Sequence, residues 1–351
     1  RCCLSPARSA CRTMTIPNDT ILLLIFWALK VFPKLGLMDR PHRYGLDRKP
    51  IPYYGGLVIF SAFLISVLIF VPLTMQLKGL ILGSILVVFL GFMDDLLGLS
   101  PWVRLGVQFL AALILVFSGI GILSINLPFL GMVDFSGPMI VGIHVLSAFF
   151  TIFWVMTILN TMNFVDGVSG LSSGVTFIAS LTMFFLSINP SVHENPQSQI
   201  PVAMIAIILA MVSLAFLLFD FPKPRILMGD TGSTFFGFVI ATLAIFSGGK
   251  VATAFLVLGI PILDMVWVIF RRIFSGKKFW KGDRKHLHHR LLDFGLTERK
   301  VVSMYLVITA AFGFGAVSLV SSQQKFFMII ALGVLMVLLA MALIFLPKKN
   351  G

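Results

Sequence analysis

Long stretches without charged residues constrain this chain more than any other feature of its sequence. The run from Gly79 to Met93, for example, contains no charged side chain. A helix needs about 20 mostly apolar residues to cross the hydrocarbon core of a bilayer. The pattern recurs along the chain and predicts eleven spans, near 16–33, 55–72, 77–94, 102–122, 138–160, 168–188, 200–219, 232–248, 251–271, 301–321 and 325–347.

The composition excludes a water-soluble globular domain. Of the 351 residues, 58% are hydrophobic and only 12% are charged. So few polar side chains could not cover the surface of a soluble protein of this size, whereas lipid could. We therefore predict an all-α polytopic membrane protein with about 11 transmembrane helices, forming one domain over residues 14–351. Residues 123–137 alternate apolar and small side chains and contain Gly and Pro, which predicts a short outer β-hairpin.

The first 13 residues differ from the rest of the chain. They have no hydrophobic period and no initiating Met, so we expect a non-native or disordered segment that ends where Met14 begins the natural chain. All three cysteines, Cys2, Cys3 and Cys11, lie in this segment. The membrane domain is therefore expected to have no disulfide and no cysteine-based metal site.

The basic residues predict how the chain is oriented in the membrane. Lys and Arg are enriched on the cytoplasmic side of membrane proteins. With eleven spans, an outer N-terminus and a cytoplasmic C-terminus, most of them fall on inner segments, above all the loop 272–300. The net charge of +13 is then explained by anionic lipids and an anionic substrate rather than by nucleic acid.

Several acidic residues are predicted to lie at the same cytoplasmic face. Asp94 and Asp95 form a pair at the end of a span, and Asp166, Asp220 and Asp230 follow or precede other spans. Ionised carboxylates beside a hydrocarbon layer are costly and usually functional. If the helices pack as a bundle, these groups converge in one cytoplasmic cleft, where hard oxygen ligands favour Mg²⁺ or Mn²⁺.

Two polar motifs flank these acids. Asn160, Asn163 and Asp166 recur every three residues and would share one side of a helix, although an Asx- and Gly-rich turn explains the composition equally well. The second motif, Gly229-Asp230-Thr231-Gly232-Ser233, provides either a simple helix N-cap or a helix N-terminus that binds phosphate beside a metal-binding carboxylate.

Three histidines, His286, His288 and His289, lie in the loop 272–300. Zinc is disfavoured because no cysteine is near and basic residues flank the cluster, so an anion is the better ligand. A solvated basic loop held to anionic lipid is the alternative. Together the motifs predict a metal-dependent phosphoryl site: acids for Mg²⁺ and basic groups for phosphate oxygens.

The ordered motifs from Pro50-Ile51-Pro52-Tyr53-Tyr54-Gly55-Gly56 to His286-Leu287-His288-His289 resemble the polyprenyl-phosphate N-acetylhexosamine-1-phosphate transferases. The form of the histidine motif is similar to the branch that uses UDP-GlcNAc rather than to the phospho-MurNAc-pentapeptide transferases of peptidoglycan synthesis. The resemblance covers the chain from about Leu35 to Leu296. It also includes Asp264, which precedes Arg271-Arg272.

The resemblance implies roles for individual residues. Asp94 and Asp95 correspond to the acidic pair tied to catalysis and the lipid phosphate, and Asp166 to a catalytic position near the nucleotide. Asp230, with Asn163, corresponds to the Mg²⁺ ligands. The implied substrate-binding residues are Asn160, Ser169, Arg104, Arg272, His286, His288 and His289. Ser169 stands where the family often has Asp, which puts recognition of the base by this position in question.

The implied reaction joins UDP-GlcNAc and undecaprenyl phosphate to give a lipid diphosphate sugar and UMP. It would be the first membrane step of O-antigen, enterobacterial common antigen or teichoic acid synthesis, in the inner membrane of a bacterium. The sequence leaves a homodimer open. The alternatives are the peptidoglycan transferase and a cation-coupled transporter, which would carry acids at mid-membrane within repeated halves.

Overall fold

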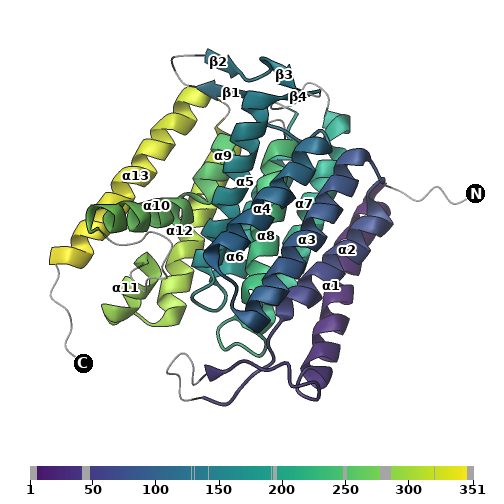
Figure 1. The fold of residues 1–351 in the computed structure, drawn as a ribbon, viewed down its shortest axis with the longest axis vertical. Helices are drawn as coiled ribbons and strands as arrows, with labels where there is room; N and C mark the ends of the chain where they lie inside the picture. The colour runs from purple at the N-terminus through teal and green to yellow at the C-terminus, as the bar shows by residue number, and fades with distance from the viewer. Residues whose placement is uncertain are drawn as a thin grey trace, which may run out of the picture.

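The computed structural model describes residues 6–41, 48–127, 129, 131–140, 142–190, 192, 196–247, 251–276, 286–319 and 321–345. Its helices are α1 (Pro6–Val31), α2 (Gly55–Phe70), α3 (Met75–Leu97), α4 (Pro101–Phe117), α5 (Val145–Val165), α6 (Leu171–Ile188), α7 (Ile200–Asp220), α8 (Gly229–Phe246), α9 (Val251–Val257), α10 (Gly259–Phe274), α11 (Leu287–Asp293), α12 (Glu298–Ser318) and α13 (Ser322–Phe345), with a 3₁₀ turn at Pro196–Gln199. Most of them run side by side as one bundle (Figure 1).

The prediction of an all-α multi-pass membrane protein is confirmed. Among the described residues, seven helices are long and apolar enough to cross a membrane, and α9 with α10 forms an eighth if the bent pair is one span. The apolar helices α2 and α4 are shorter. Every predicted span thus has a helical counterpart, and α1 includes Met14 within its 26 residues.

Polar residues end these helices where the sequence changes from apolar to polar. Thr74 caps α3, accepting a hydrogen bond from the Leu77 amide at 3.2 Å, and Gly98 ends the same helix at a positive φ of 67°. Ser100 then caps α4, with Pro101 at its first position, where the missing N–H costs nothing. The acidic end of α3 therefore turns directly into α4.

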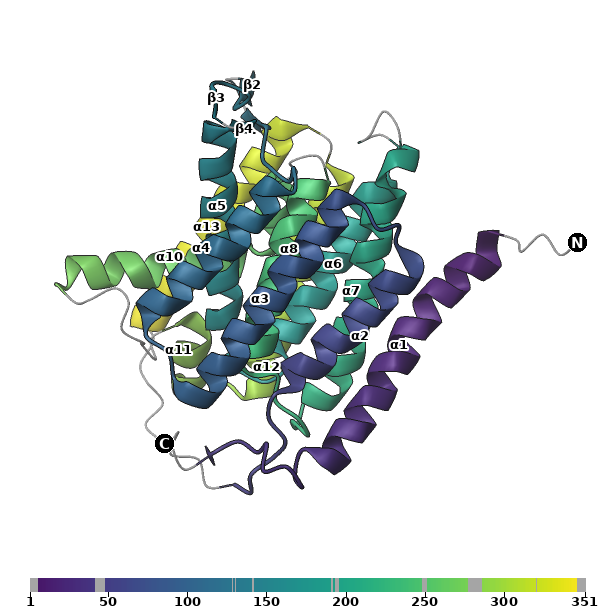
Figure 2. The same ribbon diagram turned by 45° about the vertical axis from the view of Figure 1, so that its right-hand side comes forward.

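The span predicted near 251–271 consists of two helices rather than one continuous helix. The chain bends by 82° between α9 and α10, and α10 lies across the direction of the other helices (Figure 1) and projects from the bundle (Figure 2). Pro261 favours the break because proline cannot continue a preceding helix. A side chain at Gly259 would also meet Leu332 of α13, 2.0 Å from its Cδ2. Hydropathy alone does not reveal this bend, since both segments are apolar.

The predicted hairpin is present, and a second one accompanies it. Strand β1 (Ser124–Leu127) pairs antiparallel with β2 (Gly131–Asp134), with Ser124 opposite Asp134. Strand β3 (Met139–Ile140) pairs with β4 (Ile143–His144), which the sequence did not predict. Both hairpins lie at one end of the bundle (Figure 1).

Helix α8 forms the centre of the bundle. Almost every residue from Gly229 to Ile245 is buried, and the helix packs mainly against α3 and α5, with further contacts to α2 and α6. Its N-terminus, which carries Asp230, meets the C-terminal ends of α3 and α5 and the N-terminal end of α4 at the end of the bundle opposite the hairpins (Figure 1).

Candidate active site

Glycines let the N-terminus of α8 touch the backbones of two neighbouring helices. A Cβ on Gly56 of α2 would lie 2.2 Å from the Gly232 nitrogen, and a Cβ on Gly91 of α3 would lie 2.5 Å from Thr231 Cα. Two backbone hydrogen bonds extend this contact, from Gly55 N to Leu227 O at 2.8 Å and from Gly56 N to the following carbonyl at 2.9 Å. The end of the segment 50–56 therefore packs directly against the segment that carries Asp230.

Asp95 holds this N-terminus from α3. One carboxylate oxygen accepts the backbone N–H of Asp230 at 3.0 Å and the hydroxyl of Tyr53 at 3.0 Å. The other accepts the backbone N–H and the hydroxyl of Thr231, at 3.1 and 2.6 Å. A carboxylate that caps free helical N–H groups also interacts favourably with the helix dipole. Asp95 does not line the cavity, so the structure places it as a support of the site.

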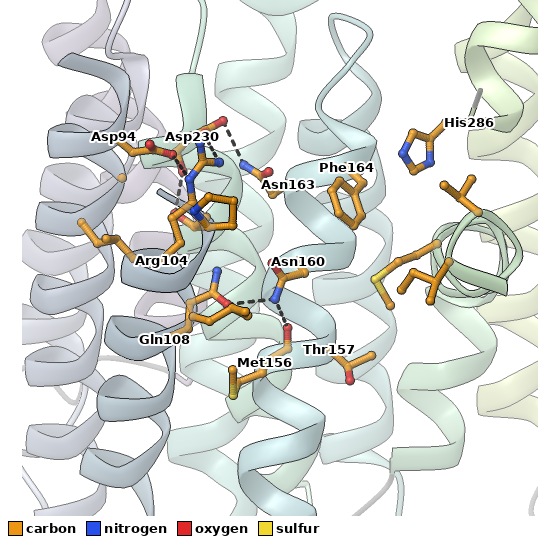
Figure 3. Close-up of a pocket in the computed structure, with 18 of the residues that line it drawn as sticks. Asp94, Arg104, Gln108, Met156, Thr157, Asn160, Asn163, Phe164, Asp230 and His286 are labelled. Carbon is orange, nitrogen blue, oxygen red and sulfur yellow. Dashed lines mark hydrogen bonds and ion pairs between the residues drawn. The ribbon is translucent and has the colours of Figure 1, made fainter. Parts of the chain in front are cut away.

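Asp94 faces the other way, into a charged centre shared by four helices (Figure 3). Arg104 Nε lies 2.8 Å from Asp94 Oδ2, and Arg104 Nη1 lies 3.4 Å from Asp230 Oδ2. The Asn163 amide donates to the other Asp230 oxygen at 2.9 Å. The Leu99 amide binds Asp94 Oδ1 at 2.7 Å. Four of the residues predicted from distant motifs are therefore brought together.

The donor set of this centre fits a magnesium ion. Mg²⁺ typically takes one or two carboxylates and completes its shell with water and substrate phosphate. Asp94 and Asp230 provide two carboxylates on one arginine. Asn163, whose Nδ2 donates to Asp230, carries an amide oxygen as a further neutral donor beside them. No cluster of three or more His, Cys, Asp or Glu side chains that could enclose a metal occurs in the described part of the chain. Such a cluster is not needed for an ion that keeps its waters.

A cavity of about 560 Å³ opens beside the charged centre. One end carries Asp94, Arg104, Asn163 and Asp230. The remaining wall, contributed mainly by α4, α5 and α10, is largely apolar and comprises Leu90, Gly91, Pro101, Leu105, Gln108, Phe153, Met156, Thr157, Asn160, Phe164, Thr234, Met265, Val268, Ile269, Arg272 and His286. The lateral course of α10 closes this wall, so the bend that hydropathy missed shapes the cavity.

A second polar pair lies deeper in the cavity (Figure 3). Asn160 donates from Nδ2 to Gln108 Oε1 at 2.8 Å, and Gln108 is only 2% exposed. The sequence reasoning missed Gln108. Its signal was present, since Gln108 is the only polar side chain in the apolar run 105–117.

The histidines divide between two places. His286 lines the cavity, and its Nδ1 lies 3.1 Å from Asp264 Oδ2, whose other oxygen accepts the Leu287 amide at 2.9 Å. His288 is buried against the 160–171 motif, because a Cβ on Gly167 would lie 2.6 Å from its Nε2 and 3.3 Å from Nε2 of His289. Burial, together with the neighbouring imidazoles of His289 and His286, lowers the pKa of His288 to about 3. His288 is therefore neutral at physiological pH.

Asp166 and Ser169 lie outside the cavity wall, in the turn after α5. Burial raises the pKa of Asp166 well above its usual range, and the negative charges of Asp220, Asp230 and Asp95 add to this. Asp220 is committed to structure here: it accepts the Gly170 amide at 2.8 Å and the Ser173 hydroxyl at 3.1 Å. The predicted convergence of the acids is thus present, although only Asp94 and Asp230 face the cavity.

Comparison with known proteins agrees with this site. The sequence model of "Glycosyl transferase family 4" matches residues 77–248, the part that carries the acidic pair, both Asn residues and Asp230. Residues 77–248 of the chain are thus similar to glycosyl transferase family 4, and the relatives described next extend this similarity over most of the chain.

The similar curated proteins span most of this chain. A probable undecaprenyl-phosphate N-acetylglucosaminyl 1-phosphate transferase of Bacillus subtilis is 28% identical over 310 residues, covering 86% of this chain and 83% of the relative. A decaprenyl-phosphate N-acetylglucosaminephosphotransferase of Mycobacterium tuberculosis is 28% identical over 332 residues (87% and 81%). An undecaprenyl-phosphate alpha-N-acetylglucosaminyl 1-phosphate transferase of Escherichia coli is 29% identical over 319 residues (85% and 81%). The family resemblance read from the motifs is confirmed.

Replacing Gly91 by Ala should displace the N-terminus of α8, because the new Cβ would collide with backbone rather than with a movable side chain. We expect a loss of about 1–3 kcal/mol of stability, as for overpacked cores, measured as a lower thermal unfolding temperature in detergent. The same change at Gly106 of α4, where no atom lies within 4 Å, should not lower that temperature, because Ala favours a helix more than Gly does. Equal behaviour of the two variants would contradict the close backbone contact.

His288 should make the fold sensitive to acid. Its pKa is about 3 in the folded protein, against 6.5 for a solvent-exposed histidine. As the pH falls below 6.5, the unfolded state therefore binds a proton that the folded state does not bind. Between pH 7 and 5 the lost stability is about 2 kcal/mol. Thermal unfolding of His288→Gln should show a flatter pH dependence than wild type. The same change at His144, which is only partly buried, should not flatten it; equal slopes in all three proteins would refute the buried neutral state.

Proposed function

We propose that the protein transfers GlcNAc-1-phosphate from UDP-GlcNAc to a polyprenyl phosphate and releases UMP. The observation that carries the proposal is the centre formed by Asp94, Arg104, Asn163 and Asp230 at one end of an apolar cavity. The charged end suits phosphate groups with a divalent cation, and the apolar wall suits a lipid chain. The names of the relatives described above give a polyprenyl phosphate and a transferred N-acetylglucosaminyl phosphate group, which favours this reaction over the transporter and over the peptidoglycan transferase.

In the proposed reaction, an oxygen of the lipid phosphate attacks the phosphorus that bears the sugar. The new P–O bond joins the two phosphates, the bond to the UMP oxygen breaks, and UMP leaves with its electron pair. A phosphate monoester with a second pKa near 6 is already mostly a dianion at neutral pH. Asp94 accepts the remaining proton where one is present, so no strong base is required.

Asp230 and Asn163, with Asp94, would hold Mg²⁺, or Mn²⁺ in its place. When bound, the ion neutralises charge on the transferring phosphoryl group. Arg104 contributes a permanent positive charge beside the same oxygens. Arg272 and His286, which line the α10 side of the cavity, would bind the diphosphate of UDP-GlcNAc.

Asp95 assists this chemistry indirectly in the proposal, by holding the Asp230 backbone. His288, His289, Asp166 and Ser169 would act at the nucleotide end, next to the turn that follows α5. A covalent sugar-phosphate adduct on an Asp is the alternative route. Trapping such an adduct with UDP-GlcNAc in the absence of lipid would overturn direct attack.

The proposed setting is a bacterial inner membrane with the site facing the cytoplasm, where UDP-sugars are made. The N-terminus then lies outside, the C-terminus lies in the cytoplasm, and the two hairpins face outward. The enrichment of basic residues in segments at the site end supports this orientation.

The first test is release of UMP by the purified protein. We expect release only when UDP-GlcNAc, undecaprenyl phosphate and Mg²⁺ are all present, and loss of release when a chelator removes the metal. Asp230→Asn should lower turnover by about 100-fold or more, because it removes an anionic ligand from a charge-stabilising site. Asp134→Asn, in the exposed hairpin, is the matched control. Normal turnover in Asp230→Asn would overturn the site assignment.

A further inference from the structure

The deep pair of amides, Gln108 and Asn160, is not explained by the charged centre. Gln108 belongs to α4 and Asn160 to α5, and both line the cavity (Figure 3). Gln108 is 2% exposed, within a wall that is otherwise apolar at this depth. A buried amide in such surroundings is costly unless its donors and acceptor are satisfied.

The hydrogen bonds fix which way each amide points. Asn160 Nδ2 donates to the backbone carbonyl of Met156 at 2.7 Å, and a carbonyl oxygen can only accept, so this end of Asn160 must be the NH₂ group. The atom of Gln108 that meets the same NH₂ at 2.8 Å must then be Oε1. The NH₂ group of Gln108 consequently points away from Asn160, and Gln108 makes no second hydrogen bond among the described residues.

Gln108 lies directly below Arg104 on the same helix. Residues four apart share one face of a helix, and four residues of rise place Gln108 about 6 Å deeper in the bundle. Arg104 already bridges Asp94 and Asp230. Helix α4 therefore aligns two donors along the cavity wall, a guanidinium at the charged centre and a neutral amide beneath it.

We propose that Gln108 binds the phosphate of the lipid acceptor through Nε2 and, with Arg104, aims it at the charged centre. This inference rests on the proposed function. The ligand must have an anionic oxygen next to Arg104, and the part of the ligand attached to it must be apolar enough to contact Leu105, Phe153 and Met156. A polyprenyl phosphate meets both conditions. The diphosphate of UDP-GlcNAc offers the same oxygens, but a sugar and a uridine on either side would leave polar groups against this apolar wall.

The competing explanation is that the pair only links α4 to α5, since polar side chains commonly bond across membrane helices. That accounts for the bond between Oε1 and Asn160. It gives no role to the Gln108 NH₂ group, which points away from Asn160 and toward the side of Arg104 in Figure 3. The two explanations differ in what they predict for substrate binding.

The test compares Gln108→Met and Gln108→Glu with wild type, using separate titrations of undecaprenyl phosphate and UDP-GlcNAc in the UMP-release assay. Gln108→Met removes the donor and keeps the length of the side chain. Gln108→Glu keeps an acceptor for Asn160 but replaces the donor by an anion. Gln76→Met, an exposed residue in the first turn of α3, is the matched control.

We expect KM for undecaprenyl phosphate to rise about 10- to 100-fold in both Gln108 variants, which is the effect of losing one hydrogen bond to a charged group. The rise in Gln108→Glu should be at least as large, and KM for UDP-GlcNAc should stay within about twofold in both variants. Because Gln108→Glu retains the bond to α5, it tests the proposal even if Gln108→Met does not fold.

Three results would overturn the inference and can be told apart. An equal rise in both KM values, or a rise for UDP-GlcNAc alone, would assign Gln108 to the nucleotide phosphates. Unchanged KM values with a lower unfolding temperature would leave only the link between helices. Absence of UMP release by wild type would instead refute the proposed function on which the inference rests.

Discussion

The hydrogen bonds from the N-terminus of α8 to the Asp95 carboxylate are the interaction on which the rest of the site depends. Asp95 lies in the last turn of α3, where the dipole of its own helix disfavours a negative charge. It is stabilised there by the backbone amides of Asp230 and Thr231, at the opposite and favourable end of α8. From the end of α3, the carboxylate therefore satisfies backbone N–H groups that would otherwise be free at the start of α8. Its partner Asp94, one residue away, is turned toward the cavity.

Asp95 reaches these amides only because the backbones of α2 and α3 directly contact the backbone of α8. Gly56 and Gly91 bring α2 and α3 against the first turn of α8 at distances that any Cβ would prevent. The result is a rigid floor for Asp230, with its neighbour Asn163 supplied by α5. Rigid placement of the charged groups matters for phosphoryl transfer, in which the protein acts mainly by positioning substrates and neutralising charge.

Charge balance explains how such a centre is tolerated beside lipid. Two carboxylates would repel each other in a medium of low dielectric, but Arg104 reaches both of them. The apolar part of the cavity begins directly below, and α10 forms one side of it. The same few residues thus separate a charged zone of the cavity from an apolar zone.

The sequence by itself determined the class of the protein, the helical segments, the first hairpin and the motifs that carry Asp94, Asn163 and Asp230, whereas Arg104 was implied only by the family resemblance. Each follows from local information: hydropathy marks spans, and acids, Asn and Gly at span ends mark the motifs. Only the tertiary structure decided which residues face the cavity. Asp94 and Asp95 are adjacent in the sequence, yet the packing of α3 against α8 gives them different places. Asp95 caps the N-terminus of α8, and Asp94 lines the cavity. Likewise, the bend before α10 and the pairing of Gln108 with Asn160 depend on contacts between segments far apart in the chain, which hydropathy and spacing do not encode.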